Sequence, residues 1–234
     1  MSSTTGPCYK VGVLLFQGTD ILDFAGPMEV LSHVSHNRNP NQPDRMFTLE
    51  TIAQSPTICA AGGSCLTVQV DTLLEHALRQ IYKYDILVVP GGTPSVTQPL
   101  VDGDGPELEF IRQFAALSIP PSRKPRILFS VCTGVLLVGA AGVLGGMTVT
   151  THHRAVDELR AICERFNKSG SSNVLHKRYI DGGLLKGGSV QLITAGGISS
   201  GLDASLHLVS QLTDPDMAAF VSRVMEYDWT EQDK

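Results

Sequence analysis

Short runs of β-branched and aliphatic residues alternate along this chain with longer segments in which apolar residues recur every three or four positions. The short runs are typical of buried strands, and the longer spacing is typical of helices that bury one face. The clearest strands are expected at 11–16, 85–89 and 127–131. Because helix-like segments alternate with the strands, the pattern predicts an α/β fold with a mainly parallel sheet.

The same two patterns predict the remaining elements. Shorter strands are expected at 47–53, 66–70, 147–151 and 191–194, together with a hairpin over 174–185. Helices are expected at about 27–36, from 71 through 80, and at 107–117, 135–141, 153–166, 202–212 and 215–227.

Three local signals predict where elements begin or turn. Pro27 lacks an N–H group and therefore fits the first turn of the first helix. Asp71 has the side chain of an N-cap residue for the helix that runs through Gln80. The motif Asp181-Gly182-Gly183 predicts the turn of the hairpin.

The 234 residues contain no internal repeat, no low-complexity tract and no linker long enough to divide the chain. A chain of this length can bury a sizeable core by itself. We therefore expect a single domain over 1–234, with a short disordered N-terminus at about 1–8 and a C-terminal tail at about 229–234.

Charge and cysteine usage limit the partners and the compartment. The formal net charge of -5 offers no attraction for a phosphate backbone or an anionic membrane, so neither nucleic acid nor a membrane is an expected partner. No apolar run is long enough to cross a bilayer, and the first residues do not resemble a signal peptide. The 5 cysteines cannot all pair and lack zinc-ligand spacing, which indicates free thiols in the cytoplasm.

Candidate chemistry follows three of the predicted strands. In a parallel α/β sheet, ligands bind beyond the carboxyl ends of the strands, where loop amides and helix N-termini converge. That rule places residues 20–26, the motif Pro90-Gly91-Gly92 and the turn at Cys132 close together. We expect a site for a small-molecule substrate there.

Cys132 stands at the turn from a predicted strand to a predicted helix. Such a position lowers the pKa of a thiol through the helix dipole and free amides, which favours a nucleophilic thiolate. Gly134 permits a sharp turn, and the amide of Thr133 is expected to point at charge that develops on a substrate atom. Spacing alone leaves a buried structural thiol as an equal alternative, and the other four cysteines are interpreted as packed or surface thiols.

Four segments, ILDFAGPMEVL, DILVVPGGT, SVCTGVLLVGAAGVLGGMTVTTHH and ITAGGISSGLDASLHL, resemble the successive signatures of the ThiJ/PfpI superfamily over 11–212. The Asp of LDFAGP with the Cys-Thr of SVCTG is similar to its isocyanide hydratase subgroup. This resemblance implies a flavodoxin-like, doubly wound sheet with helices on both faces, and usually a homodimer. It also implies Cys132 as nucleophile, Asp23 as its acidic neighbour, Thr133 as a supporting residue, and the amides of Gly91 and Gly92 around the site.

The function that these residues predict is a hydro-lyase that adds water to an isocyanide and releases an N-substituted formamide. Cys132 would attack the isocyanide carbon, and Asp23, beside a like charge in a partly dry pocket, would act as general acid. No metal and no organic cofactor are expected. Read without the resemblance, Asp23 is more simply a helix cap.

Three alternatives stay open. A cofactor-free glyoxalase acting on 2-oxoaldehydes would also use Cys132, but related glyoxalases usually place a His where this chain has Thr133. A redox-sensing or protective protein would act through oxidation of Cys132. A regulator is possible because similar domains precede helix-turn-helix modules in some transcription factors, although no such module follows the last predicted helix.

Other conspicuous residues are interpreted as structural. His152 and His153 are adjacent, so their rings are expected to point apart and not to bind a metal together. An aromatic residue often follows TTH in the hydratases, and His153 departs from that pattern. The pairs Gly145-Gly146, Gly187-Gly188 and Gly196-Gly197 lack a phosphate-binding pattern and predict tight turns.

Overall fold

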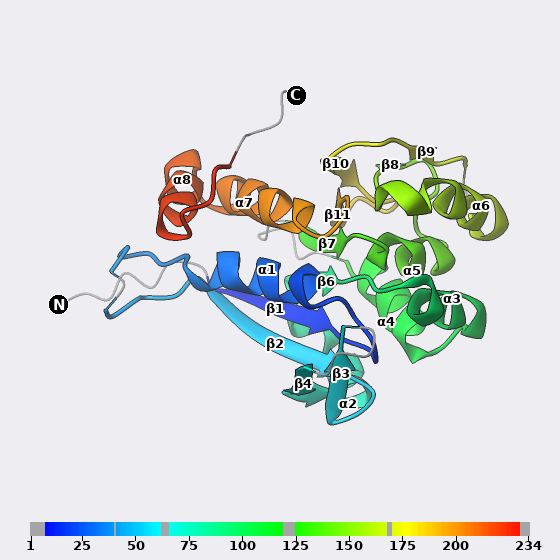
Figure 1. Cartoon of the computed structure of the whole chain (residues 1–234), viewed down its shortest axis with the longest axis horizontal. Coiled ribbons are helices and arrows are strands. Elements are labelled where there is room, and N and C mark those ends of the chain that lie inside the picture. The colour runs from blue at the N-terminus through cyan, green and yellow to red at the C-terminus, as the bar shows by residue number, and fades with distance from the viewer. Residues whose placement is uncertain (1–7, 40, 62–65, 119–124, 168–169, 230–234) are drawn as a thin grey trace.

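A seven-stranded sheet forms the centre of the computed structural model, in the order β10-β11-β7-β6-β1-β2-β5 (Figure 1). The structure describes residues 8–39, 41–61, 66–118, 125–167 and 170–229. All neighbouring strands in this sheet are parallel except β10, which runs antiparallel to β11. The strands are β1 (Tyr9–Leu14), β2 (Phe47–Ala53), β5 (Thr72–Leu73), β6 (Ile86–Val89), β7 (Arg126–Val131), β10 (Tyr179–Leu184) and β11 (Val190–Ala195).

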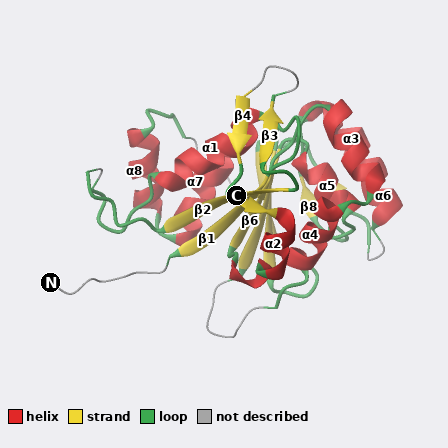
Figure 2. Ribbon diagram, turned by 90° about the horizontal axis from the view of Figure 1, so that it is seen from below, coloured by secondary structure: helices red, strands yellow, loops and turns green. Residues whose placement is uncertain are grey.

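Helices cover both faces of the sheet, which is the flavodoxin-like arrangement (Figure 2). One face carries α1 (Ile21–Ser32), α7 (Ser200–Leu212) and α8 (Pro215–Val224). The other carries α2 (Leu74–Arg79), α3 (Pro94–Gly103), α4 (Pro106–Ala115), α5 (Gly134–Ala140) and α6 (Val156–Phe166). The longest described helix has 13 residues, too few to cross a bilayer.

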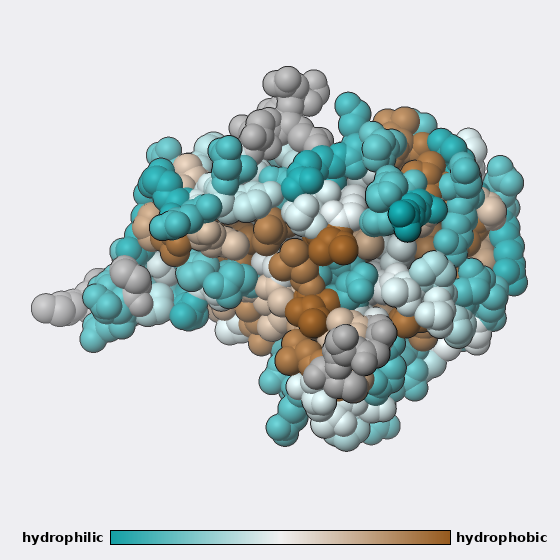
Figure 3. Space-filling view, viewed as in Figure 1, coloured by the Kyte–Doolittle hydropathy of each residue, from teal (hydrophilic) through white to brown (hydrophobic). Residues whose placement is uncertain are grey.

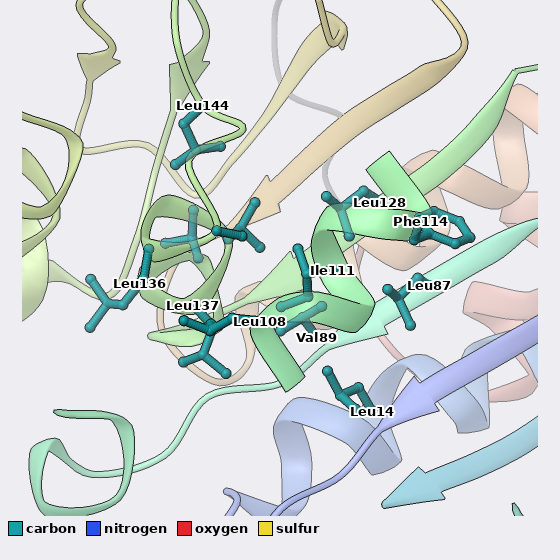
Figure 4. Close-up of a cluster of buried hydrophobic side chains, with 14 of the residues drawn as sticks. Leu14, Leu87, Val89, Leu108, Ile111, Phe114, Leu128, Leu136, Leu137 and Leu144 are labelled. Carbon is teal, nitrogen blue, oxygen red and sulfur yellow. The ribbon is translucent and has the colours of Figure 1, made fainter. Parts of the chain in front are cut away.

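Each face of the sheet has its own apolar core. Between the sheet and α4 and α5, side chains from both layers interdigitate (Figure 4). They include Leu14, Leu87, Val89, Leu108, Ile111, Leu128, Leu136 and Leu137. Full burial of such a side chain stabilises a fold by roughly 1.5–3 kcal/mol, so the two cores hold the strand ends rigidly in place.

The long apolar strands agree with the sequence pattern to within two residues at each end. The first helix does not. α1 begins at Ile21, six positions before Pro27, and Pro27 lies inside it. Proline there removes one backbone hydrogen bond, and the buried side chains of Phe24, Val30 and Leu31 offset that loss by packing against the sheet.

Asp71 does not cap a helix. Its Oδ2 atom accepts hydrogen bonds from the backbone N–H of Thr51, at 2.8 Å, and from the Thr51 hydroxyl, at 2.6 Å. The chain then adds the short strand β5 before α2 begins at Leu74. The carboxylate therefore ties the start of β5 to β2, a tertiary bond that local sequence does not reveal.

The predicted hairpin turn at Asp181-Gly182-Gly183 is also wrong. β10 continues through these residues to Leu184 with a bulge between Asp181 and Gly183. The turn lies between Leu184 and Val190, where Gly187 and Gly188 adopt positive φ angles. Glycine and aspartate suit a bulge as well as a turn, so the motif alone cannot separate them.

The strands predicted at 66–70 and 147–151 are confirmed as β4 (Leu66–Gln69) and β8 (Thr148–Val149), but neither belongs to the main sheet. Their partners were not expected: β3 (Thr57–Ala60) pairs antiparallel with β4, and β9 (Asn173–Val174) pairs with β8. α3 contains two prolines, which hid it from helical spacing. Two 3-10 turns, Ile81–Lys83 and His153–Ala155, precede β6 and α6.

Most of both predicted disordered ends, residues 1–7 and 230–234, lies outside the described residues. Trp229, which was assigned to the C-terminal tail, is partly buried against the core on the α1 and α7 side.

Candidate active site

The turn between β7 and α5 holds Cys132 in a left-handed backbone conformation, with φ of 58°. A non-glycine residue costs about 1–2 kcal/mol there, as at other strained strand-to-helix turns that expose a nucleophile. The Cys132 amide donates to the carbonyls of Ala195, at 3.1 Å, and Gly196, at 2.9 Å, at the end of β11. Gly134 is required because a Cβ there would lie 2.1 Å from the carbonyl oxygen of Val89.

Asp23 reaches the same place from the first turn of α1. Its side chain is fully buried, and its Oδ2 atom accepts a hydrogen bond of 3.0 Å from the Gly91 amide at the end of β6. Its Oδ1 atom has no hydrogen-bond partner among the described residues. The Cys132 sulfur and carboxylate oxygens of Asp23 and Asp20 all lie within 4.8 Å of one another.

Thr133 joins the Cys132 turn to the loop after β6. Its hydroxyl donates to the Gly92 carbonyl at 2.7 Å and accepts from the Gly92 amide at 2.9 Å. Gly91 must be glycine because a Cβ there would lie 2.4 Å from the Thr133 Oγ1 atom. The segments that sequence reasoning grouped, around Asp23, Gly91-Gly92 and Cys132, therefore do meet.

The amides of Gly91 and Gly92 do not have the role that was expected of them at the site. They are bonded to Asp23 and Thr133 inside the protein, so they position these side chains and do not face an open substrate space. The amides that approach the Cys132 sulfur are those of Ile198 and Thr133. These two N–H groups are the ones placed to stabilise negative charge on sulfur.

Burial changes the titration of both reactive groups. Burial and the nearby Asp20 charge raise the pKa of Asp23 to about 7, against the opposing effect of the Gly91 amide and the Cys132 thiol. Burial and the Asp23 charge raise the pKa of Cys132 to about 12, although the Ile198 and Thr133 amides oppose the shift. The expectation of a lowered thiol pKa is therefore wrong, because desolvation and a neighbouring carboxylate outweigh the amides.

Sequence reasoning missed three contributors. Asp20 precedes Asp23 by three positions, so a helical spacing test on residues 20–26 could have found it. Ile198 follows β11, and the strand-end rule that located Cys132 applies equally to it. The motif Gly196-Gly197, which precedes Ile198, is thus part of the site as well as a tight turn. His152 packs on Gly197, and the Asp20 charge acts on its imidazole.

The two adjacent histidines do not point apart. The ring centroids of His152 and His153 lie 4.2 Å from each other, and the His152 Nδ1 atom accepts a hydrogen bond of 3.3 Å from the Arg154 amide. Burial lowers the pKa of His152. Among the described residues, Asp20, Asp23 and Cys132 form the one cluster of three potential metal ligands, and it excludes both histidines.

A flavodoxin-like sheet with a strained, buried cysteine against a carboxyl group at its strand ends defines a class of cysteine-centred α/β proteins. Comparison with known proteins identifies the family. Residues 9–211 match the DJ-1/PfpI family, and the chain belongs to it.

Among curated relatives, the chain is 32% identical over 218 residues to the isonitrile hydratase of Pseudomonas putida, covering 93% of this chain and 78% of that one. It is 27% identical over 160 residues to the Parkinson disease protein 7 homolog of Danio rerio, covering 64% and 67%. Among solved structures, a ThiJ/PfpI family protein from Pseudomonas syringae has a TM-score of 0.72 at 22% identity, covering 96% and 77%. Drosophila melanogaster DJ-1beta has a TM-score of 0.70 at 14% identity, covering 95% and 100%.

Proposed function

We propose that this protein hydrates isocyanides, also called isonitriles, to N-substituted formamides. The observation that carries the proposal is the buried pair of Asp23 and Cys132, in which a carboxyl group with a pKa of about 7 lies beside a neutral thiol. Such a carboxyl group can take and return a proton near neutral pH. The similarity to a named isonitrile hydratase over most of the chain supports the same reaction.

In the first step, sulfur forms a bond to the terminal isocyanide carbon. Because the pKa of the Cys132 thiol is about 12, the proton leaves as sulfur attacks, and the Asp23 carboxylate accepts it. The amides of Ile198 and Thr133 stabilise negative charge on sulfur during the attack. Asp23 then acts as general acid and gives the proton to the same carbon, which leaves a thioimidate, R–N=CH–S–Cys132.

In the second step, water adds to the thioimidate carbon. Asp23 accepts a proton from that water and passes it to the nitrogen, which leaves R–NH–CH(OH)–S–Cys132. The carbon–sulfur bond then breaks, the hydroxyl proton passes to sulfur to restore the thiol, and the formamide R–NH–CHO leaves. The two steps together consume one isocyanide and one water, so no redox partner is needed.

The test is formamide production from an aromatic isocyanide by the wild type and by Cys132→Ala, Asp23→Asn and Thr133→Val. We expect turnover in the wild type, none in Cys132→Ala, and a loss of about 10²–10⁴-fold in Asp23→Asn. Thr133→Val removes both bonds to Gly92 and is expected to reduce turnover less. Inertness of the wild type toward a panel of isocyanides overturns the proposal.

A second candidate is a cofactor-free glyoxalase. No His follows Cys132 in sequence, but His152 lies near Asp20 in the structure, and this histidine supports the glyoxalase alternative. Consumption of methylglyoxal without any hydration of isocyanides would favour it. For either reaction we propose a cytoplasmic enzyme, since Cys8, Cys132 and Cys163 are free thiols.

A further inference from the structure

A cavity of about 540 Å³ adjoins the segment that holds Ile198. Its volume lies in the range of small-ligand pockets, roughly 300–1,000 Å³. Three stretches of chain line it, namely 151–153, 176–178 and 196–200. These stretches follow β8, precede β10 and follow β11, so the cavity opens at the same edge of the sheet as the Cys132 turn.

Two of the lining segments touch the nucleophile directly. The Ile198 amide approaches the Cys132 sulfur, and the Thr151 hydroxyl donates a hydrogen bond of 3.0 Å to the Cys132 carbonyl. His152 lines the cavity, and the Asp20 charge also acts on its imidazole, so the cavity lies close to the carboxylates. A substrate whose reactive carbon meets the sulfur can therefore extend its other end into this cavity.

The lining of the cavity carries positive charge and no acidic side chain. Lys177 and Arg178 are cations, and three histidines, His152, His153 and His176, lie beside them. Lys177 is exposed and has no ion-pair partner among the described residues. This local excess contrasts with the net charge of -5 of the whole chain.

Arg178 is held in place from behind. Its Nε atom donates to the Asp203 carboxylate, and its Nη2 atom donates to the Tyr227 hydroxyl at 3.1 Å. The Tyr227 hydroxyl in turn donates to Asp203 at 3.1 Å. The guanidinium therefore stays along the cavity wall, and Lys177 supplies charge that no carboxylate of the described chain neutralises.

We propose that this cavity binds the anionic end of the substrate, so that the preferred isocyanide carries a carboxylate on its substituent. This inference rests on the proposed hydratase function. The two ends of such a substrate suit the two ends of the site. The neutral isocyanide carbon meets the sulfur beside Asp20 and Asp23, and the carboxylate lies away from these acids, next to Lys177.

The first experiment compares isocyanoacetate with its neutral methyl ester as substrates of the wild type, Lys177→Gln and Lys186→Gln. Lys186 is the matched control, since it is an exposed lysine beyond the opposite end of β10. The six residues of β10 span about 20 Å, so Lys186 lies far from the cavity. We expect the wild type to prefer the carboxylate by about tenfold in kcat/KM, through KM, and to lose that preference at high salt. Lys177→Gln should lose the preference and keep the ester rate, while Lys186→Gln should behave as the wild type.

Equal use of acid and ester by the wild type overturns the proposal, as does an equal loss for both substrates in Lys177→Gln.

A second readout does not depend on the hydratase reaction. Iodoacetate and iodoacetamide both alkylate Cys132 by displacing iodide, and peptide mapping measures each rate at that residue. We expect Lys177→Gln to lower the iodoacetate-to-iodoacetamide rate ratio several-fold relative to the wild type and Lys186→Gln. If Lys177→Gln leaves this rate ratio unchanged, the anion site is overturned even if the protein hydrates isocyanides. If the ratio falls but no isocyanide is hydrated, only the hydratase function is overturned.

Discussion

A hydrogen bond of 3.0 Å from the Gly91 amide to the Asp23 Oδ2 atom joins the loop after β6 to the first turn of α1. The carbonyl of Gly91 accepts two further bonds from the same segment, from the Asp20 amide at 2.9 Å and the Thr19 hydroxyl at 3.0 Å. One oxygen of Asp23 is thus fixed, while Oδ1 is buried without a partner among the described residues. This division leaves one oxygen of the carboxyl group to carry a proton.

The pH profile of the reaction should show the titration of Asp23. The mechanism needs the ionised carboxylate to accept the thiol proton, and the pKa of Asp23 is raised to about 7. We therefore expect kcat/KM to rise with pH up to about 7 and then level off. A profile that is flat between about pH 5 and about pH 8 would contradict this role.

Asp23→Asn should make the thiol more acidic. The Asp23 charge is the second cause, after burial, of the raised pKa of Cys132, so its removal should shift that pKa downward from about 12. The measurement is the pH dependence of iodoacetamide alkylation at Cys132. A variant that alkylates faster than the wild type at alkaline pH and still fails to turn over would separate thiol reactivity from proton transfer.

Asp23 should also reduce the stability of the protein as pH rises. Its pKa in the folded protein, about 7, exceeds the ordinary value of 3.8, so the folded state holds the proton more tightly than the unfolded state. The contribution of Asp23 to the free energy of unfolding is then greatest below pH 3.8 and falls as pH rises to about 7, by up to about 4 kcal/mol for this buried group. Asp23→Asn lacks this loss.

Thermal unfolding at about pH 5 and about pH 8 tests this relation. We expect the Tm of Asp23→Asn, relative to wild type, to be higher at the alkaline pH than at the acidic pH. A difference between the two proteins that does not change with pH would mean that Asp23 ionises with its ordinary pKa.

The strand-end rule placed the segments that hold Asp23, Gly91 and Cys132 together from sequence, because parallel strands bring their carboxyl ends to one edge whatever the details of packing. The family resemblance singled out Asp23 within residues 20–26. It could not assign the hydrogen bonds, since both glycine amides of the β6 loop turn inward to Asp23 and Thr133. The thiol pKa was predicted in the wrong direction for a related reason. Helix position is visible in a sequence, but burial and a carboxylate from a distant segment are not.

Gly91→Ala should damage the site, and Gly103→Ala should not. A Cβ at Gly91 would lie 2.4 Å from Thr133 Oγ1 and 3.0 Å from Asp23 Oδ2, so both side chains must move. At Gly103, near the end of α3, nothing lies within 4 Å. We expect Gly91→Ala to lose about 1–3 kcal/mol of stability and most of its turnover, with Gly103→Ala unchanged or slightly more stable. Full activity in Gly91→Ala would show that the positions of Thr133 and Asp23 are not critical.

Peroxide should oxidise Cys132 slowly. Thiolates react with peroxide, and burial together with the Asp23 charge raises the pKa of this thiol to about 12. Cys132 is 3% exposed, whereas Cys8 is exposed. Mass spectrometry after mild peroxide should find Cys8 modified before Cys132. The reverse order would favour the redox-sensing alternative over catalysis.

We also propose that the protein is a homodimer, formed through the face that carries the site. Figure 3 shows apolar side chains gathered in the middle of this face, over the N-terminal ends of α1 and α7. Leu22, at the start of α1, is 40% exposed, and Ile198, just before α7, is 43% exposed. Exposed apolar side chains that cluster in this way mark interaction surfaces, and a second copy would also shield the Cys132 turn from water.

The solution mass tests the dimer. We expect twice the chain mass of 25.1 kDa for the wild type and the single-chain mass for Leu22→Lys, because a buried lysine at the interface would lack a partner charge. Tyr82→Lys is the control, since Tyr82 is 58% exposed on the 3-10 turn before β6, at the opposite edge of the sheet. If the dimer covers the site, Leu22→Lys should also lose turnover, with Tyr82→Lys unaffected. A wild type that sediments as a single chain, or a Leu22→Lys protein that stays dimeric, would remove this face as the interface.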